Sequence, residues 1–169
     1  MIQVINNFLN NDKFHSIYNI ITSSNFPWYF PENGKTNFTH DIVKKSQDKV
    51  KTSFWVTPIL SPLLQEFQNI NKKISDMQLT KAKIDLTYRT NEIVENEPSV
   101  DVSKIDLNEP TETAILYLNT NDGYTQIVGS NKIESVQNRI LILPTNTSYF
   151  ETTTTDNDFR LVLKLVYKV

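Results

Sequence analysis

The sequence contains no cysteine, and this absence removes three kinds of chemistry at once. Without thiols the chain cannot form disulfides, thiolate metal sites or thiol nucleophiles. Glycine is scarce, with three residues, and the sequence has neither a Gly-rich phosphate loop nor a Gly-x-Ser-x-Gly nucleophile elbow. The only histidines are His15 and His40, which both precede the segments expected to form the core. A Ser-His-Asp triad would therefore need one of these two to reach that core.

Long apolar runs and a charge imbalance are also missing. No segment approaches the length needed to span a bilayer, and the first residues, MIQVINN, lack the basic start and apolar stretch of a secretory signal. Lysine plus arginine number 17 against 19 acidic residues, so the net charge is −2. We therefore expect no nucleic-acid partner, no membrane partner and no secretion through a signal peptide, although a local charged patch is compatible with this composition.

The second half of the chain consists of short apolar alternations separated by Asn, Asp, Gly and Pro. These alternations cover residues 113–119, 132–144 and 160–168. The separating residues tolerate turn geometry that strand residues do not, so the pattern is typical of successive strands joined by tight turns. A chain of 169 residues is long enough to bury its own core, and we expect one domain spanning 1–169. The sequence thus predicts a β-sandwich or barrel.

Two helices are predicted before this core, and both should pack on a sheet. Asp12 can cap the first helix, whose apolar side comprises Phe14, Ile17, Tyr18 and Ile21. The second begins near Thr57-Pro58 or Ser61-Pro62, and its apolar side comprises Leu60, Leu63, Leu64 and Phe67. Between them, we expect Trp28, Tyr29 and Phe30 to anchor a loop by burial.

Residues 79–89 alternate with period two, which predicts a half-buried strand. Residues 92–110 form a long acidic excursion, and loops of that length are often functional. The four threonines at 152–155 favour a strand. The final strand, 160–168, carries apolar residues on both faces, which indicates partial burial on both sides.

These segments resemble the iron(II)- and 2-oxoglutarate-dependent oxygenases, in particular small phage-type members related to prolyl hydroxylases. The motifs that carry the resemblance are NFPWYF (25–30), NFTH (37–40), KAKIDLTYRT (81–90), AILYLNTNDGYT (114–125) and ESVQNRILILP (134–144). The resemblance implies a mainly β protein with flanking helices (α+β). Its fold would be a double-stranded β-helix, a cupin-like jelly roll, with the N-terminal helices packed on the major sheet.

The chemistry of that family depends on two histidines and one carboxylate, which hold Fe(II) and leave positions open for 2-oxoglutarate and oxygen. The resemblance places Ser99 and Asp101 at the family's His-x-Asp motif and Tyr149 at its second histidine. A hydroxyl and a phenol are poor replacements for imidazole toward Fe(II). His40 matches a family histidine that is not a metal ligand. We therefore expect no metal site and no cofactor.

Arg160 falls where the family places the basic residue that pairs with the distal carboxylate of 2-oxoglutarate. The alternative is an arginine at the start of a rim strand, paired with Asp156 or Asp158. Ser99, Asp101, Tyr149 and Arg160 are thus predicted to form a vestigial pocket. Whether that pocket is open or filled by the protein's own side chains is left open by the sequence.

Two functions follow from the resemblance. The first is a non-catalytic structural or interaction protein on an oxygenase scaffold that has lost its iron ligands. Because the resembled members are abundant in phage genomes, this hypothesis predicts a tail, neck or capsid-associated virion component. Its partners would be other protein subunits in a large assembly, and its location the virion or the host cytoplasm. The alternative is an active Fe(II)/2-oxoglutarate-dependent dioxygenase (hydroxylase) with substitute metal ligands, supported by Asp101 and Arg160.

Overall fold

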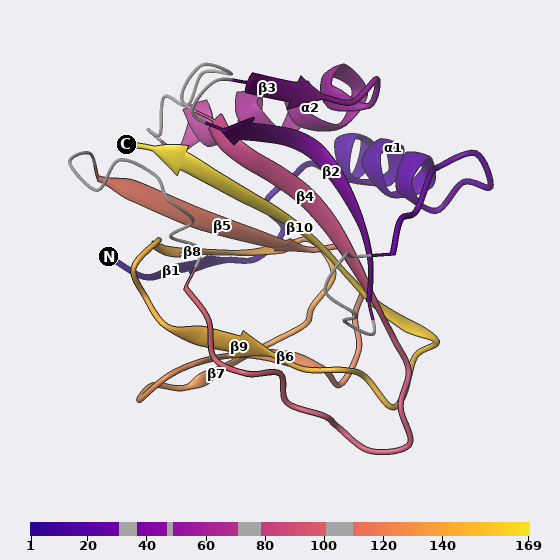
Figure 1. The fold of residues 1–169 in the computed structure, drawn as a ribbon, viewed down its shortest axis with the longest axis vertical. Helices are drawn as coiled ribbons and strands as arrows, with labels where there is room; N and C mark the ends of the chain where they lie inside the picture. The colour runs from indigo at the N-terminus through magenta and orange to yellow at the C-terminus, as the bar shows by residue number, and fades with distance from the viewer. Residues whose placement is uncertain (31–36, 47–48, 71–78, 101–109) are drawn as a thin grey trace.

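The computed structural model describes residues 1–30, 37–46, 49–70, 79–100 and 110–169. Within these residues the chain forms ten strands and two helices. Figure 1 shows three layers: the helices, a larger sheet beneath them, and a smaller sheet on the far side of the larger one. The space between the two sheets is the interior of the fold.

The major sheet has seven strands in the order β1-β8-β5-β10-β4-β2-β3, and the minor sheet has three in the order β7-β6-β9. Every pair of neighbouring strands is antiparallel. The major-sheet strands are β1 (Gln3–Ile5), β2 (Asn37–Ser46), β3 (Lys49–Thr52), β4 (Leu79–Tyr88), β5 (Thr111–Tyr117), β8 (Arg139–Pro144) and β10 (Phe159–Lys168). The minor-sheet strands are β6 (Tyr124–Ile127), β7 (Lys132–Glu134) and β9 (Tyr149–Glu151).

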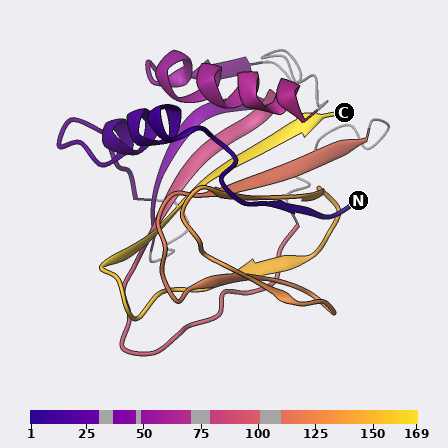
Figure 2. The same ribbon diagram turned by 180° about the vertical axis from the view of Figure 1, so that it is seen from behind.

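The two helices, α1 (Asn11–Ile21) and α2 (Val56–Asn69), lie side by side over the outer face of the major sheet (Figure 2). The predicted jelly roll with helices on its major sheet is therefore confirmed. Asn10, and not Asp12, caps α1, because its side-chain oxygen accepts a hydrogen bond from the Lys13 amide at 2.9 Å. Among the described residues, neither helix is long and apolar enough to cross a membrane.

Strand β10 separates two cores because successive side chains along a strand point to opposite faces. Leu161, Leu163 and Leu165 join the larger core under the helices. Val162 joins the smaller core between the sheets, together with Ile115, Tyr117, Ile127, Leu141, Leu143 and Tyr149. The predicted burial of this strand on both faces is confirmed.

The aromatic loop before β2 differs from its prediction. Trp28 is half-buried and packs against the outer core, but Tyr29 and Phe30 are 57% and 78% exposed. The loop is held by its backbone instead, since the Tyr29 and Thr39 amides each donate to the other residue's carbonyl oxygen, at 3.0 and 2.9 Å. The Phe30 ring packs at a tilt of 46° against Phe38, with ring centroids 4.3 Å apart. Burial is therefore not what anchors these two aromatics.

The threonine run also differs from its prediction, because the strand ends at Glu151, before the run begins. The threonine hydroxyls act as turn partners. Thr152 Oγ1 accepts from the Tyr124 amide and Thr153 Oγ1 accepts from the Val94 amide, each at 2.9 Å. The run keeps only isolated backbone bridges, from Thr152 to Glu95 and from Thr154 to Arg89, and these side-chain bonds add to them.

We predict that the outer core holds the helices onto the sheet. Replacing Phe67 by alanine should lower the free energy of unfolding by about 3–5 kcal/mol, because its fully buried ring packs against Phe8 and Tyr167. Phe54→Ala is the matched control, since Phe54 is 87% exposed, and it should leave stability nearly unchanged. Urea denaturation followed by circular dichroism measures both; similar losses in the two variants would contradict this packing.

Candidate functional site

The candidate site is the interior between the two sheets, where the resemblance would place a reactive centre. Residues that pair directly across neighbouring strands present their side chains on the same face. Arg160, Val162 and Lys164 of β10 lie opposite Thr87, Asp85 and Lys83 of β4. Val162 belongs to the core between the sheets, so all of these residues project toward the interior.

Arg160 is the largest buried side chain at this site, and it is 1% exposed. Its Nε donates to Ser135 Oγ at 2.8 Å, and its Nη2 donates to Thr125 Oγ1 at 3.1 Å. Its Nη1 donates to Glu151 Oε1 at 3.1 Å, which makes a charge-assisted pair. The guanidinium carbon lies 5.6 Å from the centre of the Tyr117 ring. Each guanidinium nitrogen therefore has a partner from the chain itself.

Glu151 belongs to β9 of the minor sheet and bridges two cations of the major sheet. Its second carboxylate oxygen accepts from the ammonium group of Lys164. Lys164 also lies 3.6 Å from Asp85 Oδ2, and the same oxygen lies 2.7 Å from Lys83 Nζ. The five side chains form one ion network across the interior: Arg160, Glu151, Lys164, Asp85 and Lys83.

Electrostatics keep both carboxylates ionised. Burial raises the pKa of Glu151, but the attraction of Lys164 and Arg160 outweighs it and lowers the pKa to about 2. Burial likewise acts against ionisation of Asp85, and the charges of Lys164 and Lys83 prevail and lower its pKa. Burial raises the pKa of Tyr117 to about 12, so its phenol stays neutral.

The Asn-Asp-Gly-Tyr turn packs directly on this network. A β-carbon on Gly123 would lie 2.8 Å from Arg160 Cδ and 2.6 Å from the Thr153 carbonyl oxygen. Both distances are shorter than a carbon atom tolerates, so only glycine fits. The Gly123 amide donates to Asn121 Oδ1 at 3.0 Å, which holds the turn closed over the guanidinium.

Three of the four predicted site residues lie among the residues that the structure describes. Ser99 and Tyr149 form an isolated antiparallel bridge, in which each amide donates to the other residue's carbonyl oxygen, at 2.8 and 3.1 Å. Tyr149 is buried, and the Lys164 ammonium lies 5.7 Å from its ring centre. Arg160 lies in the ion network, and Asp101 is outside the described residues.

The alternative pairing of Arg160 with Asp156 or Asp158 at a rim strand is wrong. Strand β10 is the middle strand of the major sheet, and Arg160 is paired with Glu151. Asp156 instead accepts hydrogen bonds from the Asp122 amide and the Thr154 hydroxyl, at 2.9 and 3.0 Å.

Neither histidine faces the interior. His40 of β2 lies opposite Ile84, whose side chain joins the core under the helices, so His40 points to the helical layer. Its Nδ1 is 2.8 Å from the Pro27 carbonyl oxygen, and its ring packs on Phe26. His15 is exposed on α1, with its Nδ1 2.8 Å from the Asn11 carbonyl oxygen.

Among the residues that the structure describes, the donors that face the interior do not fit an Fe(II) centre of the two-histidine, one-carboxylate type. The two carboxylates there are bound to ammonium and guanidinium groups, and no imidazole joins them. Within the described part of the chain, no group of three or more histidine, aspartate or glutamate side chains could hold a metal ion.

Sequence reasoning identified Arg160 but missed its partner Glu151 and the two network members Lys164 and Asp85. A signal was present, because the alternation in both long strands places Lys83, Asp85 and Lys164 on the face opposite the apolar one. Charged residues inside strands that are buried on both faces must find counter-charges. Glu151 gave no comparable signal, since it precedes a polar run.

The comparisons with known proteins support the fold. No protein-family profile matches the sequence, and no curated protein sequence matches it. A 2OG-Fe(II) oxygenase-family oxidoreductase from Burkholderia pseudomallei superposes with a TM-score of 0.71 at 9% identity, covering 99% of this chain and 84% of that one.

Two prolyl hydroxylases have similar structures. One, from Trichoplax adhaerens, was solved with a hypoxia-inducible-factor peptide; it has a TM-score of 0.65 and 12% identity, and the match covers 99% of this chain and 83% of that one. A prolyl-4-hydroxylase from Pseudomonas putida has a TM-score of 0.62 and 14% identity, with coverage of 99% and 91%. At such identities these likenesses show a shared fold and do not extend to activity.

We predict that the Glu151 carboxylate is required for stability. Glu151→Gln should lower the free energy of unfolding at pH 7 by about 3–5 kcal/mol, because it leaves Arg160 and Lys164 buried without their shared counter-charge. Glu134→Gln, a change of the same kind at an exposed position of β7, is the control and should be nearly neutral. Chemical denaturation measures both, and an equally small effect for the two variants would refute the role of the network.

The same network predicts an acid-dependent loss of stability. The pKa of Glu151 is lowered from 4.5 to about 2, so its contribution is complete above pH 4.5 and disappears as the pH falls toward 2. For Glu151 alone the loss is about 3 kcal/mol, and the lowered pKa of Asp85 adds to it. Urea midpoints measured from pH 7 to pH 2 should fall only below about pH 5, and less steeply for Glu151→Gln. An unchanged slope in the variant would contradict this assignment.

Proposed function

We propose that this protein is a non-catalytic interaction protein, built on the jelly-roll scaffold that it shares with 2OG-Fe(II) oxygenases. The observation that carries the proposal is the contact of Glu151 with Arg160 and Lys164. Each nitrogen of the Arg160 guanidinium donates to a group of the chain and its charge is paired with Glu151, so the carboxylate of a 2-oxo acid would have to compete with Glu151. Function resides in sites and not in folds, so a retained scaffold is compatible with a role that needs no chemistry.

The surface supports a role in protein assembly. Tyr29, Phe30 and Phe54 expose large aromatic side chains, which are enriched where proteins contact one another. Together with the resemblance to phage-type members, this favours a tail, neck or capsid-associated virion component whose partners are other protein subunits. The alternative, an Fe(II)/2-oxoglutarate dioxygenase with substitute ligands, would have to displace Glu151 from Arg160 before a 2-oxo acid could bind.

Titration with metal and cosubstrate tests the non-catalytic part of this proposal. Purified protein mixed anaerobically with Fe(II) and 2-oxoglutarate should give no metal-to-ligand charge-transfer band, and no succinate should form on addition of oxygen. The reason is that interior carboxylates are neutralised by cations and no imidazole faces them. An active prolyl hydroxylase under the same conditions is the positive control. A charge-transfer band or succinate from this protein would establish the enzyme instead.

The virion role is tested by composition. Virions purified from cells that produce the protein should contain it in fixed stoichiometry with the other structural proteins, as measured by quantitative mass spectrometry. Its presence only in the soluble lysate, with none in the particles, would contradict the assembly role and leave the titration result unaffected.

A further inference from the structure

The edges of the minor sheet are both guarded against pairing with another chain. Edge strand β7 exposes Lys132 and Glu134, and charged side chains on an edge discourage a further strand. Residues 95–99 run beside the other edge strand, β9, where the Asn96 amide donates to the Glu151 carbonyl oxygen at 3.0 Å. Charge therefore protects one edge of the minor sheet, and the chain itself covers the other.

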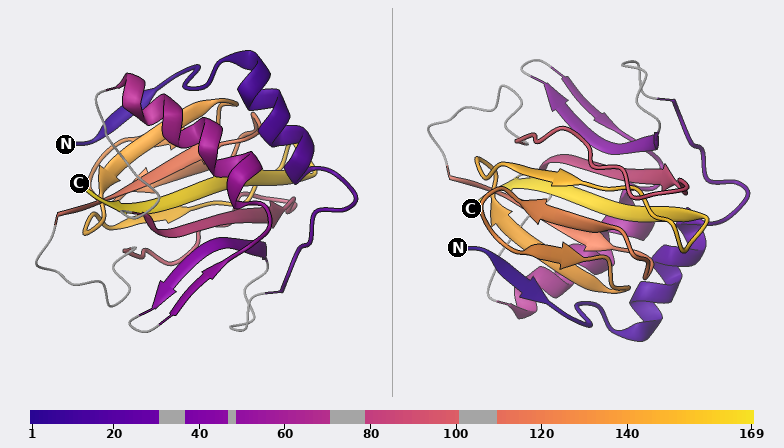
Figure 3. Two further views of the ribbon diagram at one scale, coloured as in Figure 1. Left: turned by 90° about the horizontal axis from the view of Figure 1, so that it is seen from above. Right: turned by 90° about the horizontal axis from the view of Figure 1, so that it is seen from below.

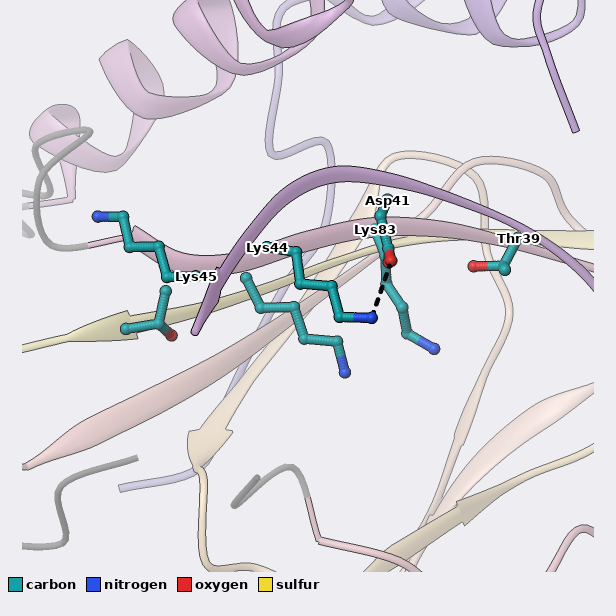
Figure 4. Close-up of a pocket in the computed structure, with 7 residues that line it drawn as sticks. Thr39, Asp41, Lys44, Lys45 and Lys83 are labelled. Carbon is teal, nitrogen blue, oxygen red and sulfur yellow. Dashed lines mark ion pairs between the residues drawn. The ribbon is translucent and has the colours of Figure 1, made fainter. Parts of the chain in front are cut away.

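The β3 edge of the major sheet is protected by lysine. Lys51 of β3 is exposed and lies directly opposite Lys44 of β2. Beside them, residues of β2 and β4 line a groove of about 360 Å³, which contains four lysines, two threonines and one aspartate. Figure 4 shows Lys44 in this groove, paired with Asp41. A second copy of the chain that paired with β3 would bring its own lysines against these.

The β1 edge of the major sheet differs from the other three. No side chain from Met1 to Asn11 carries a charge, and none of these residues is proline. Strand β1 pairs with β8 on one side, and no strand of the described part of the chain pairs with it on the other. Figure 3 shows β1 at the margin of the major sheet opposite to β2 and β3. The outer backbone groups of β1 can therefore accept another strand.

Apolar side chains lie along this edge. Val4 is opposite Leu141 of β8, which belongs to the core between the sheets, so Val4 points to the inner face. Val4 is nevertheless 47% exposed, and Met1 and Ile2 before it are exposed as well. Ile5 points to the other face and packs against the outer core, which holds β1 in place. A strand added here would gain backbone hydrogen bonds and apolar contact with Val4.

We propose that β1 pairs antiparallel with β1 of a second copy of this chain and joins the two major sheets into one. A second copy suits this edge because pairing centred on Val4 sets each Val4 against the other and Gln3 against Ile5, so no like charges meet. Each subunit has one such edge, and a twofold axis closes the assembly at a dimer.

The size of the contact sets its strength. Strand β1 is three residues long, whereas stable interfaces bury about 1,200–2,000 Å² in total. We therefore expect a reversible dimer with a Kd in the micromolar range. Pairing at β1 uses neither the interior ion network nor the Fe(II) chemistry discussed above, so it goes beyond the proposed function.

Sedimentation velocity of the full chain tests this pairing. Between about 1 and about 200 µM the wild-type protein should shift from monomer to dimer. Val4→Lys should weaken dimerisation by about tenfold or more, because it sets two ammonium groups against each other at the centre of the ladder. Val128→Lys, the same change at an exposed valine directly after β6, is the control and should leave the dimer unchanged.

A mixture of oppositely charged variants tests the register. Val4→Lys and Val4→Glu should each dimerise poorly, whereas an equal mixture should associate about tenfold more tightly than either variant alone, because lysine then faces glutamate. Both variants should keep the wild-type circular dichroism spectrum, and their melting temperatures as monomers should change by less than about 4 °C, because the Val4 side chain is half exposed.

Three results would each overturn the proposal: a wild-type protein that stays monomeric throughout this concentration range, an undiminished dimer in Val4→Lys, or a mixture that associates no better than its components. Oligomers larger than a dimer would also overturn it, because β1 offers one edge per subunit. None of these results depends on the iron titration or on the composition of virions, so this proposal and the proposed function fail separately.

Discussion

The bridge that Glu151 makes between Arg160 and Lys164 is the interaction on which the interior depends. Both cations come from β10 of the major sheet, and the carboxylate comes from β9 of the minor sheet. Thr125, which lies opposite Glu151 in the minor sheet, also accepts a hydrogen bond from Arg160. The facing pair Thr125 and Glu151 of the minor sheet therefore fixes how the two sheets face each other. Residues around it are constrained in turn, and Gly123 is the clearest case because no larger residue fits beside the guanidinium.

Stability alone does not explain such a network. Removing charges from water costs several kcal/mol per ion, and well-packed apolar residues of similar volume are often at least as stable as a buried ion pair. Apolar side chains could occupy this space instead of the charged ones, because Tyr117, Val162 and Tyr149 already line it. Specificity of sheet registration is one reason to keep the charges. Under the proposed function, Glu151 also takes the place of an external carboxylate, which leaves the interior satisfied without a ligand.

Sequence patterns predicted the two helices and strands β4 and β10, because packing under the helices gives residues such as Ile84 and Leu163 a regular period. They did not predict β2. Its register shifts between Asp41 and Val43, so the alternation is interrupted in the middle of the strand. The site was predictable in part: alternation places Arg160 and Lys164 on one face of β10. Their partner Glu151 comes from a separate sheet, and such long-range pairing leaves no local period in the sequence.

The inner face of the major sheet lies in two different environments. Toward its middle the minor sheet covers it, and every charge there must be matched within the chain because water is excluded. Toward the β2–β3 margin the cover ends, and Lys44 and Lys51 can remain cationic in solvent at little cost. Lys83 lies at the boundary, since it lines the groove and also bonds Asp85 at the end of the buried network. Charges on this face are therefore matched within the chain where the minor sheet covers it, and they meet solvent where the cover ends.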